Sequence, residues 1–241
     1  LRICQITIEG GMRRINHYKM KSYDSSGKVT FEQEVNYQNS DKVSFSASGS
    51  INTADGKTIP ISTELNISRD LFDYFLNQAS GEDGPTSPMV FNFDGLSKDL
   101  TTTKFTFDLD ADGAPDQLSF VKNSGYLVLD KNNDGIINDG KELFGNNSKN
   151  LYLAQYDSDY NGWIDENDPI FDKLRIWSKD QDGNDILLGL GAKGIGAIYL
   201  GSLRLPLPDY NGLGSGVVNG GLYVKKDGTV GNTFQIESGN F

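Results

Sequence analysis

Four short segments rich in aspartate, asparagine and glycine recur within one third of this chain. They read DLDADGAPD, DKNNDGIINDGKE, DSDYNGWIDEND and KDQDGND, and they begin at Asp108, Asp130, Asp157 and Lys179. Their starts lie 22, 27 and 22 residues apart, and short apolar pieces such as YLVL and PIFDKLRIW separate them. The pattern predicts a spaced series of loops joined by short elements rather than a low-complexity tract.

The charge of the protein is concentrated in the same third. The whole chain of 241 residues carries a net charge of −11, but residues 108–185 hold 17 acidic and 7 basic side chains, a net of −10. Like charges 4 Å apart repel by roughly 1 kcal/mol per pair even in water. Two or three divalent cations would remove four to six of these charges. We therefore expect this third to be loose without ions and rigid with them.

Calcium is the cation that such loops suit. It takes six to eight oxygen ligands, and a contiguous loop supplies them from side chains at positions 1, 3 and 5. A glycine at position 6 reverses the backbone, position 7 gives its carbonyl, and positions 9 and 12 add side chains. The alternative is an acidic surface turn that holds no ion.

The third loop fits this template at every position. Aspartate or asparagine stands at positions 1, 3, 5, 9 and 12, and a tryptophan carbonyl is available at position 7. The predicted ligands are Asp157, Asp159, Asn161, Trp163, Asp165 and Asp168. Aspartate replaces the usual glutamate at position 12, which predicts weaker affinity or more tolerance of magnesium. Ile164 at position 8 is expected to pair with a neighbouring loop.

The second loop fits at its front half. Position 12 is Lys141, which cannot be a ligand, and Glu142 comes one residue late. A one-residue bulge near Asp139 and Gly140 would bring Glu142 round, and Asp139 is an alternative to Asn138 at position 9. The predicted ligands are Asp130, Asn132, Asp134, Ile136 through its carbonyl, Asn138 or Asp139, and Glu142.

The first and fourth loops fit less well. The first offers Asp108, Asp110, Asp112 and Asp116, but Ser119 stands at position 12, so it would bind weakly or lend carboxylates to a site that another segment closes. The fourth offers Asp180 and Asp182, with Asp185 as a further candidate, and an acidic turn is the alternative.

The segments on either side predict β structure. Residues 29–37, 43–48 and 58–67 read as strands, and Ser68 reads as the N-cap of a short helix that ends near Gln78. The fold class expected is α+β, rich in strand, with short helices flanking the loops. We expect a β-rich region with one short helix at 1–80, a linker at 81–90, a calcium module at 91–201 and, at 202–241, a C-terminal β segment that packs on the module.

Several segments together resemble a known bacterial module. FDLDADG, GYLVLDKNNDGIINDGKELFG, LAQYDSDYNGWIDENDPIFDKLRIW and GIGAIYL are similar to the EF-hand-like calcium module of large RTX-type surface and secreted proteins, and to proteins called VCBS or FG-GAP-like. The similarity covers about 91–201. It implies calcium binding, with two or three ions, and an extracellular or cell-surface location. NNSKN after Gly145 replaces the longer glycine-rich connection of that pattern.

The resemblance leaves three functions open. In the first, calcium locks the module into its working shape. In the second, the loops use calcium to reach a glycan or protein ligand at a cell surface. Some proteins that resemble this module also process themselves at an Asp-Pro bond, and Asp168–Pro169 is the single such pair here. A simpler account of that pair is that Asp168 closes the third loop and Pro169 starts a helix.

Other chemistry finds little support. The one histidine, His17, lies far from the loops, and Cys4 is the one cysteine, so neither a histidine triad nor a disulfide framework is expected. We expect no enzyme activity, and the acidic charge argues against a nucleic-acid partner. No apolar run reaches the roughly 18 residues of a membrane span. Leu1–Glu9 lacks the pattern of a signal peptide, and a piece of a longer protein remains an alternative.

Overall fold

A computed structural model describes most of the chain. The described residues are 6–7, 17–23, 29–38, 42–52, 58–68, 70–71, 73–74, 88–93, 96–97, 104–145, 152–180, 182–207, 216–238.

The N-terminal part forms a six-stranded sheet in which only the β5–β7 pair is parallel. Its strands are β1 (Ile6–Thr7), β2 (His17–Tyr23), β3 (Val29–Gln38), β4 (Lys42–Asn52), β5 (Thr58–Ser68) and β7 (Leu96–Ser97). The three strands predicted in this part are therefore confirmed.

A short helical stretch follows β5. Asp70, Leu71, Asp73 and Tyr74 have helical conformation, and Ser68 Oγ accepts a hydrogen bond from the Leu71 amide at 3.3 Å. The predicted N-cap is thus present, since a serine in this place satisfies one of the free amides of the first turn. Leu71 is buried, and the Tyr74 hydroxyl contacts the backbone of Ser119. Leu71 and Tyr74 therefore pack on the apolar cluster that includes Tyr126 and Trp177 of the second sheet.

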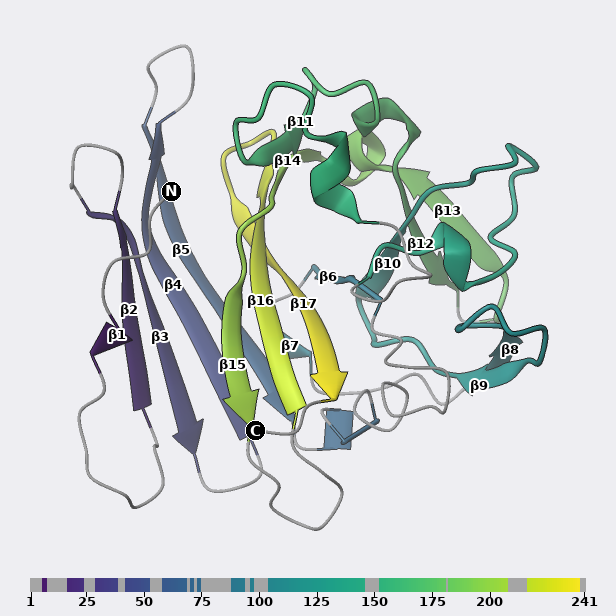
Figure 1. The fold of residues 1–241 in the computed structure, drawn as a ribbon, viewed down its shortest axis with the longest axis horizontal. Coiled ribbons are helices and arrows are strands. Elements are labelled where there is room, and N and C mark those ends of the chain that lie inside the picture. Colours follow the sequence, from purple (N-terminus) through teal and green to yellow (C-terminus); the bar gives the residue numbers. More distant parts are fainter. Residues whose placement is uncertain are drawn as a thin grey trace.

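The second sheet is antiparallel and has nine strands. They run in the order β11-β14-β16-β17-β6-β10-β12-β13, and β15 pairs with β16 beside this path. The bounds are β6 (Val90–Asn92), β10 (Ser124–Val128), β11 (Trp163–Asp165), β12 (Arg175–Lys179), β13 (Asp185–Gly189), β14 (Ile195–Tyr199), β15 (Leu203–Leu207), β16 (Gly216–Lys225) and β17 (Val230–Ser238). Figure 1 shows β15, β16 and β17 between the N-terminal strands and β10, β12 and β13.

The remaining elements are small. A separate hairpin consists of β8 (Phe105–Phe107) and β9 (Asp116–Leu118). Within the described residues, the 3-10 helices are η1 (Gly140–Glu142), η2 (Leu153–Tyr156), η3 (Phe171–Lys173) and η4 (Leu190–Lys193).

The expected α+β class is wrong, because the described part of the chain is nearly all β. Helical elements beside the loops are 3-10 turns of three or four residues. Short apolar pieces such as YLVL and PIFDKLRIW separate the loops. The β-branched and aromatic residues of these pieces, such as Ile176 and Trp177, instead pair as strands.

Side chains of the second sheet alternate between two apolar clusters. Tyr126, Trp177 and Leu222 belong to one cluster, and their neighbours Leu127, Ile176 and Tyr223 belong to the other. Successive residues of a strand point to opposite faces, so both faces of the sheet are covered. The first cluster includes Leu109 and Ile137 of the first two loops, and the second includes Ile164 of the third. The loops therefore attach to both faces.

The predicted domain boundaries stay predictions. The strands of 202–241 nevertheless lie inside the second sheet, since β16 and β17 connect β14 to β6. Asn232 Nδ2 of β17 also donates to the Glu64 carbonyl oxygen of β5 at 2.9 Å, which links the two sheets. In the part of the chain that the structure describes, no helix has the length and apolar character needed to cross a membrane.

Candidate functional site

The first three acidic loops share one backbone geometry. In each, the aspartate at position 1 accepts hydrogen bonds from the amides of positions 5 and 6, one on each carboxylate oxygen. These aspartates are Asp108, Asp130 and Asp157, and the six distances are 2.8–3.2 Å. The position-3 side chain also accepts a hydrogen bond from the backbone amide of position 5. The position-5 side chain accepts one from the backbone amide of position 7. The side chains at positions 1, 3 and 5 therefore turn toward the inside of each loop.

Two residues of each loop have a left-handed backbone. The position-6 glycines Gly113, Gly135 and Gly162 have φ of 95°, 80° and 84°. A Cβ on any of these glycines would meet nothing within 4 Å, so the backbone conformation and not space favours glycine. Position 4 is also left-handed, with φ of 58° at Tyr160. Such conformations cost non-glycine residues roughly 1–2 kcal/mol, and functional sites commonly carry this strain.

Asp168 closes the third loop. Its Oδ1 accepts from the Ser158 amide at 2.7 Å and from the Ser158 hydroxyl at 2.9 Å, and its Oδ2 accepts from the Asp165 amide at 3.0 Å. Only 2% of Asp168 is exposed. Burial acts to raise the pKa of Asp168, but the three hydrogen bonds outweigh it and hold that pKa below its usual 3.8. Asp168 therefore remains a carboxylate in the folded protein near neutral pH.

Carboxylate oxygens converge inside the third loop. Asp157, Asp159 and Asp168 offer oxygens that all lie within 4.8 Å of one another. Asn161 Nδ2 donates to Asp159 Oδ2 at 3.0 Å and to Asp165 Oδ2 at 3.5 Å. Oxygens that share a calcium ion at about 2.3–2.6 Å can be at most about 5 Å apart. The group could therefore hold one metal ion.

Glu142 closes the second loop in the same way. Its oxygens accept from the amides of Lys131 and Asn138 at 2.9 and 2.8 Å, at positions 2 and 9, as Asp168 does in the third loop. The second loop has one residue more before its closing carboxylate than the third loop has. The 3-10 helix η1 accommodates this residue at the place where a bulge was predicted. Asp139 is its N-cap and accepts from the Lys141 amide. Asp139 is thus held outside the loop.

Asparagine side chains also converge in the second loop. Asn132 Nδ2 donates to Asp134 Oδ2 at 2.8 Å and to Asn138 Oδ1 at 2.9 Å. Asn138, not Asp139, therefore shares the centre of the loop with positions 3 and 5. The Ile136 amide, which donates to Asp134, holds the pKa of that carboxyl below its usual value. The Ile136 side chain is exposed.

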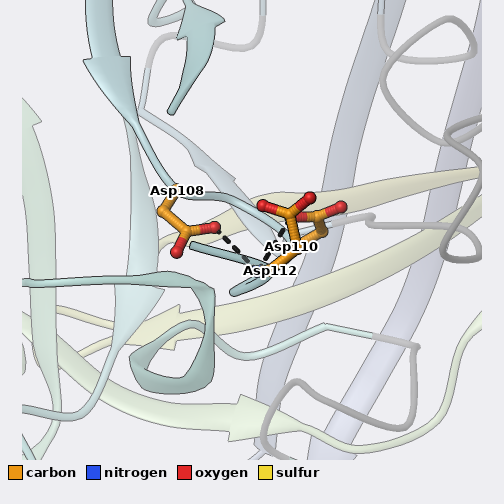
Figure 2. A group of neighbouring side chains, drawn as sticks. All are labelled: Asp108, Asp110 and Asp112. Carbon is orange, nitrogen blue, oxygen red and sulfur yellow. Dashed lines mark hydrogen bonds between the residues drawn. The ribbon is translucent and has the colours of Figure 1, made fainter. Parts of the chain in front are cut away.

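The first loop connects β8 and β9. Asp108, Asp110 and Asp112 offer oxygens within 4.8 Å of one another, and Figure 2 shows their carboxylates around the turn. Asp116 Oδ2 accepts from the Leu109 amide at 3.0 Å. Asp116 thus makes the position-2 contact that Glu142 and Asp168 make in the longer loops.

The first and second loops touch through their backbones. The Gly140 amide donates to the Asp108 carbonyl oxygen at 2.8 Å, and Asp108 bridges to Asp139 in parallel register. A Cβ on Gly140 would overlap the carbonyl oxygen of Leu109, so only glycine allows this approach. The contact joins position 1 of the first loop to the helix that carries Glu142.

The fourth loop differs from the other three. It is the turn of the β12–β13 hairpin, in which Asp180 accepts from the amides of Asp182 and Asn184. Asp185 Oδ1 accepts from Trp177 Nε1 at 2.7 Å and from Lys179 Nζ at 2.6 Å. The described residues of this loop form no group of three carboxylates within reach of one ion. The metal role predicted for Asp180 and Asp182 therefore stays a prediction.

Two expectations about the loop surroundings are wrong. Ile164 pairs with Ile198 of β14, not with a neighbouring loop. Pro169 does not start the next helix, because η3 begins at Phe171. EF-hand architecture is not shown, since strands and 3-10 turns flank the loops. Sequence reasoning also missed Ser158, whose hydroxyl at position 2 binds the closing carboxylate; a serine beside an aspartate carries no distinctive signal.

Comparison with known proteins identifies the family of the chain. Residues 89–237, more than half of the chain, match the SPM domain.

The chain belongs to the SPM domain family.

The SPM domain match extends beyond the predicted module and includes β16 and β17. The chain is also 31% identical over 169 residues to the iron-regulated protein FrpA of Neisseria meningitidis serogroup C. That alignment covers 62% of this chain and 15% of the length of FrpA, so the chain spans only a small part of this relative. No solved structure matches the chain.

The pH dependence of stability should reveal the closing carboxylate of this SPM domain. The pKa of Asp168 is below 3.8 in the folded protein and near 3.8 when unfolded, so ionised Asp168 stabilises the fold above about pH 3.8. That contribution is lost as pH falls through the folded pKa. In calcium-free buffer, thermal melting should show wild type more stable than Asp168→Asn near neutral pH, and the difference should shrink below pH 3.8. A difference that stays constant down to pH 2 would contradict this.

Proposed function

We propose that this SPM domain binds calcium in its acidic loops, and that the ions lock the domain of a surface or secreted bacterial protein into its working shape. The observation that carries the proposal is the convergence of Asp157, Asp159 and Asp168 within 4.8 Å, with Asp168 98% shielded from solvent. Buried carboxylates without a cation nearby are costly, and calcium ligands need this spacing.

The shared geometry of the loops supports more than one ion. The second loop repeats the third in its position-1 contacts and in its closing carboxylate, and the first brings three aspartates together. Two or three divalent ions would offset four to six of the ten excess negative charges of residues 108–185. Calcium is favoured over zinc, because the converging groups are oxygens and no histidine or cysteine lies in this third.

A structural role is supported by the position of the loops. Their apolar residues Leu109, Ile137 and Ile164 are buried in clusters on the two faces of the second sheet. An ion that orders a loop therefore also fixes part of the core. The similarity to FrpA and the resemblance to RTX-type proteins support an extracellular location for the protein. Extracellular calcium would then be the ion that the loops bind.

Calorimetric titration of calcium into chelator-treated protein tests the proposal. We expect two or three equivalents per chain, with heat that magnesium at the same concentration does not reproduce in full. Absence of saturable heat would sink the proposal.

Glu142→Gln should remove one equivalent. Only 5% of Glu142 is exposed, and the change removes one negative charge and points an amide N–H at the Lys131 or Asn138 donor. Leaving such a donor unpaired costs about 1–3 kcal/mol. The matched control is Glu166→Gln, because Glu166 lies in the third loop but is exposed. Equal stoichiometry in both variants would show that Glu142 does not close an ion site.

A further inference from the structure

One face of β16 and β17 changes from apolar to polar along the strands. Tyr223 belongs to the apolar cluster of this face, but two and four residues earlier the same face presents Gly221 and Asn219. Across the ladder, Asn219 lies opposite Gln235 and Gly221 lies opposite Thr233. Asn219 is 5% exposed and Thr233 is 3% exposed. Buried polar side chains at the centre of a sheet are uncommon and usually have a structural or functional reason. We call Asn219, Gly221, Thr233 and Gln235 the polar patch.

Gly221 opens space above the patch. It stands in the middle of a ten-residue strand, where glycine weakens the sheet and commonly marks the close approach of a ligand or another chain. A Cβ at this position would collide with Thr233 Oγ1. Any other residue would therefore cover the threonine hydroxyl.

A cavity of about 190 Å³ lies over these residues. Its wall includes Asn219, Gly221, Thr233 and Gln235, and its other side comes from η2 and from the link between β14 and β15. Tyr152, just before η2, contributes to this other side and is 56% exposed. None of the residues that line the cavity is charged. In a protein of net charge −11, this cavity therefore has a neutral wall, and it adjoins the third loop where the Leu200 amide donates to the Gly162 carbonyl oxygen.

We propose that this cavity binds a small neutral ligand that carries several hydroxyl groups, of the chemistry of a single sugar unit. Amide and hydroxyl side chains both donate and accept hydrogen bonds, which suits hydroxyl groups. A tyrosine at the rim suits the apolar face of a sugar ring. A charged ligand would find no counter-charge here, and an apolar ligand would gain nothing from the amides. The volume is below the roughly 300–1,000 Å³ of sites for drug-sized molecules, which favours one ring.

The test is a titration of the full chain with D-glucose, D-galactose and N-acetyl-D-glucosamine, followed by amide chemical shifts in NMR spectra at saturating calcium. At least one sugar should give saturable shifts at residues 219–221 and 233–235, with an affinity on the order of millimolar. Thr233→Val keeps the shape and removes the hydroxyl, and should weaken binding about fivefold or more. Gln235→Leu should weaken it similarly and serves as a second variant.

Thr106→Val is the matched control, since Thr106 is exposed on β8 and remote in sequence from the cavity wall. It should bind the sugar as wild type does. Absence of saturable shifts with all three sugars, or equal affinity in wild type, Thr233→Val and Gln235→Leu, would overturn the proposal. The calcium titration is a separate measurement on the same samples. Sugar binding can therefore fail while calcium binding stands, and the reverse.

Discussion

Calcium should raise the melting temperature of the chelator-treated protein by about 8–16 °C per occupied site at a concentration 1,000 times the dissociation constant. At this concentration, each site that binds calcium only in the folded state stabilises that state by about 4 kcal/mol. One kcal/mol corresponds to about 2–4 °C for a chain of this size. The effect is large because the loops carry most of the negative charge and hold apolar residues of both core clusters. Differential scanning calorimetry with and without calcium measures it.

Hydrogen exchange provides the spatial control for this effect. The amides of residues 108–168 should gain protection on calcium addition, because the loops become rigid. The turn at Asp227 and Gly228 is a built-in reference, since Asp227 accepts from Thr229 within a simple hairpin turn and has no ion role in the proposal. Melting curves that coincide with and without calcium, with unchanged exchange in the loops, would contradict structural ion binding.

Asp168→Ala should destabilise the calcium-free protein by about 3 kcal/mol or more and should abolish binding at the third loop. The substitution leaves the Ser158 amide, the Ser158 hydroxyl and the Asp165 amide without their acceptor at a partly buried position. Each unsatisfied buried donor costs about 1–3 kcal/mol, and water entering the space recovers part of that cost. Denaturant unfolding measures the first effect, and calorimetry should show one equivalent fewer of calcium.

Asp172→Ala is the matched control for this variant. Asp172 has the same charge, lies four residues away and is exposed in η3. It should change stability by less than about 0.5 kcal/mol and should leave the stoichiometry unchanged. If Asp168→Ala behaved like Asp172→Ala in both measurements, the closing role of Asp168 would be refuted. Wild type and Asp168→Ala also test processing at Asp168–Pro169. We expect no calcium-dependent fragment on gels from wild type or from Asp168→Ala.

The interior of each loop could be predicted from the sequence. The contacts of Asp157 with the amides of Asn161 and Gly162 span only four and five residues. Such contacts depend on the conformation of a few neighbours, and a glycine at position 6 fixes the turn. The strands of the N-terminal sheet were predictable for a similar reason, since alternation along one segment indicates its two faces.

The surroundings of the loops could not be predicted in this way. EF-hand spacing suggested flanking helices and loop-to-loop pairing, but Ile164 pairs with β14 and 3-10 turns replace the helices. Strand pairing depends on segments that are distant along the chain and compete for the same apolar surface. The fourth loop shows the same limit, because Asp185 was a further candidate ligand, whereas in the structure Trp177 and Lys179 donate hydrogen bonds to it within a hairpin.

The sequence by itself therefore determined where the acidic turns lie and which carboxylate and amide side chains they bring together. Only the tertiary structure decided that Ile164 pairs with β14, that the first loop docks on Gly140, and that β16 and β17 line a neutral cavity. Contacts within a turn are fixed by adjacent residues, whereas these three features depend on segments brought together by the packing of the second sheet.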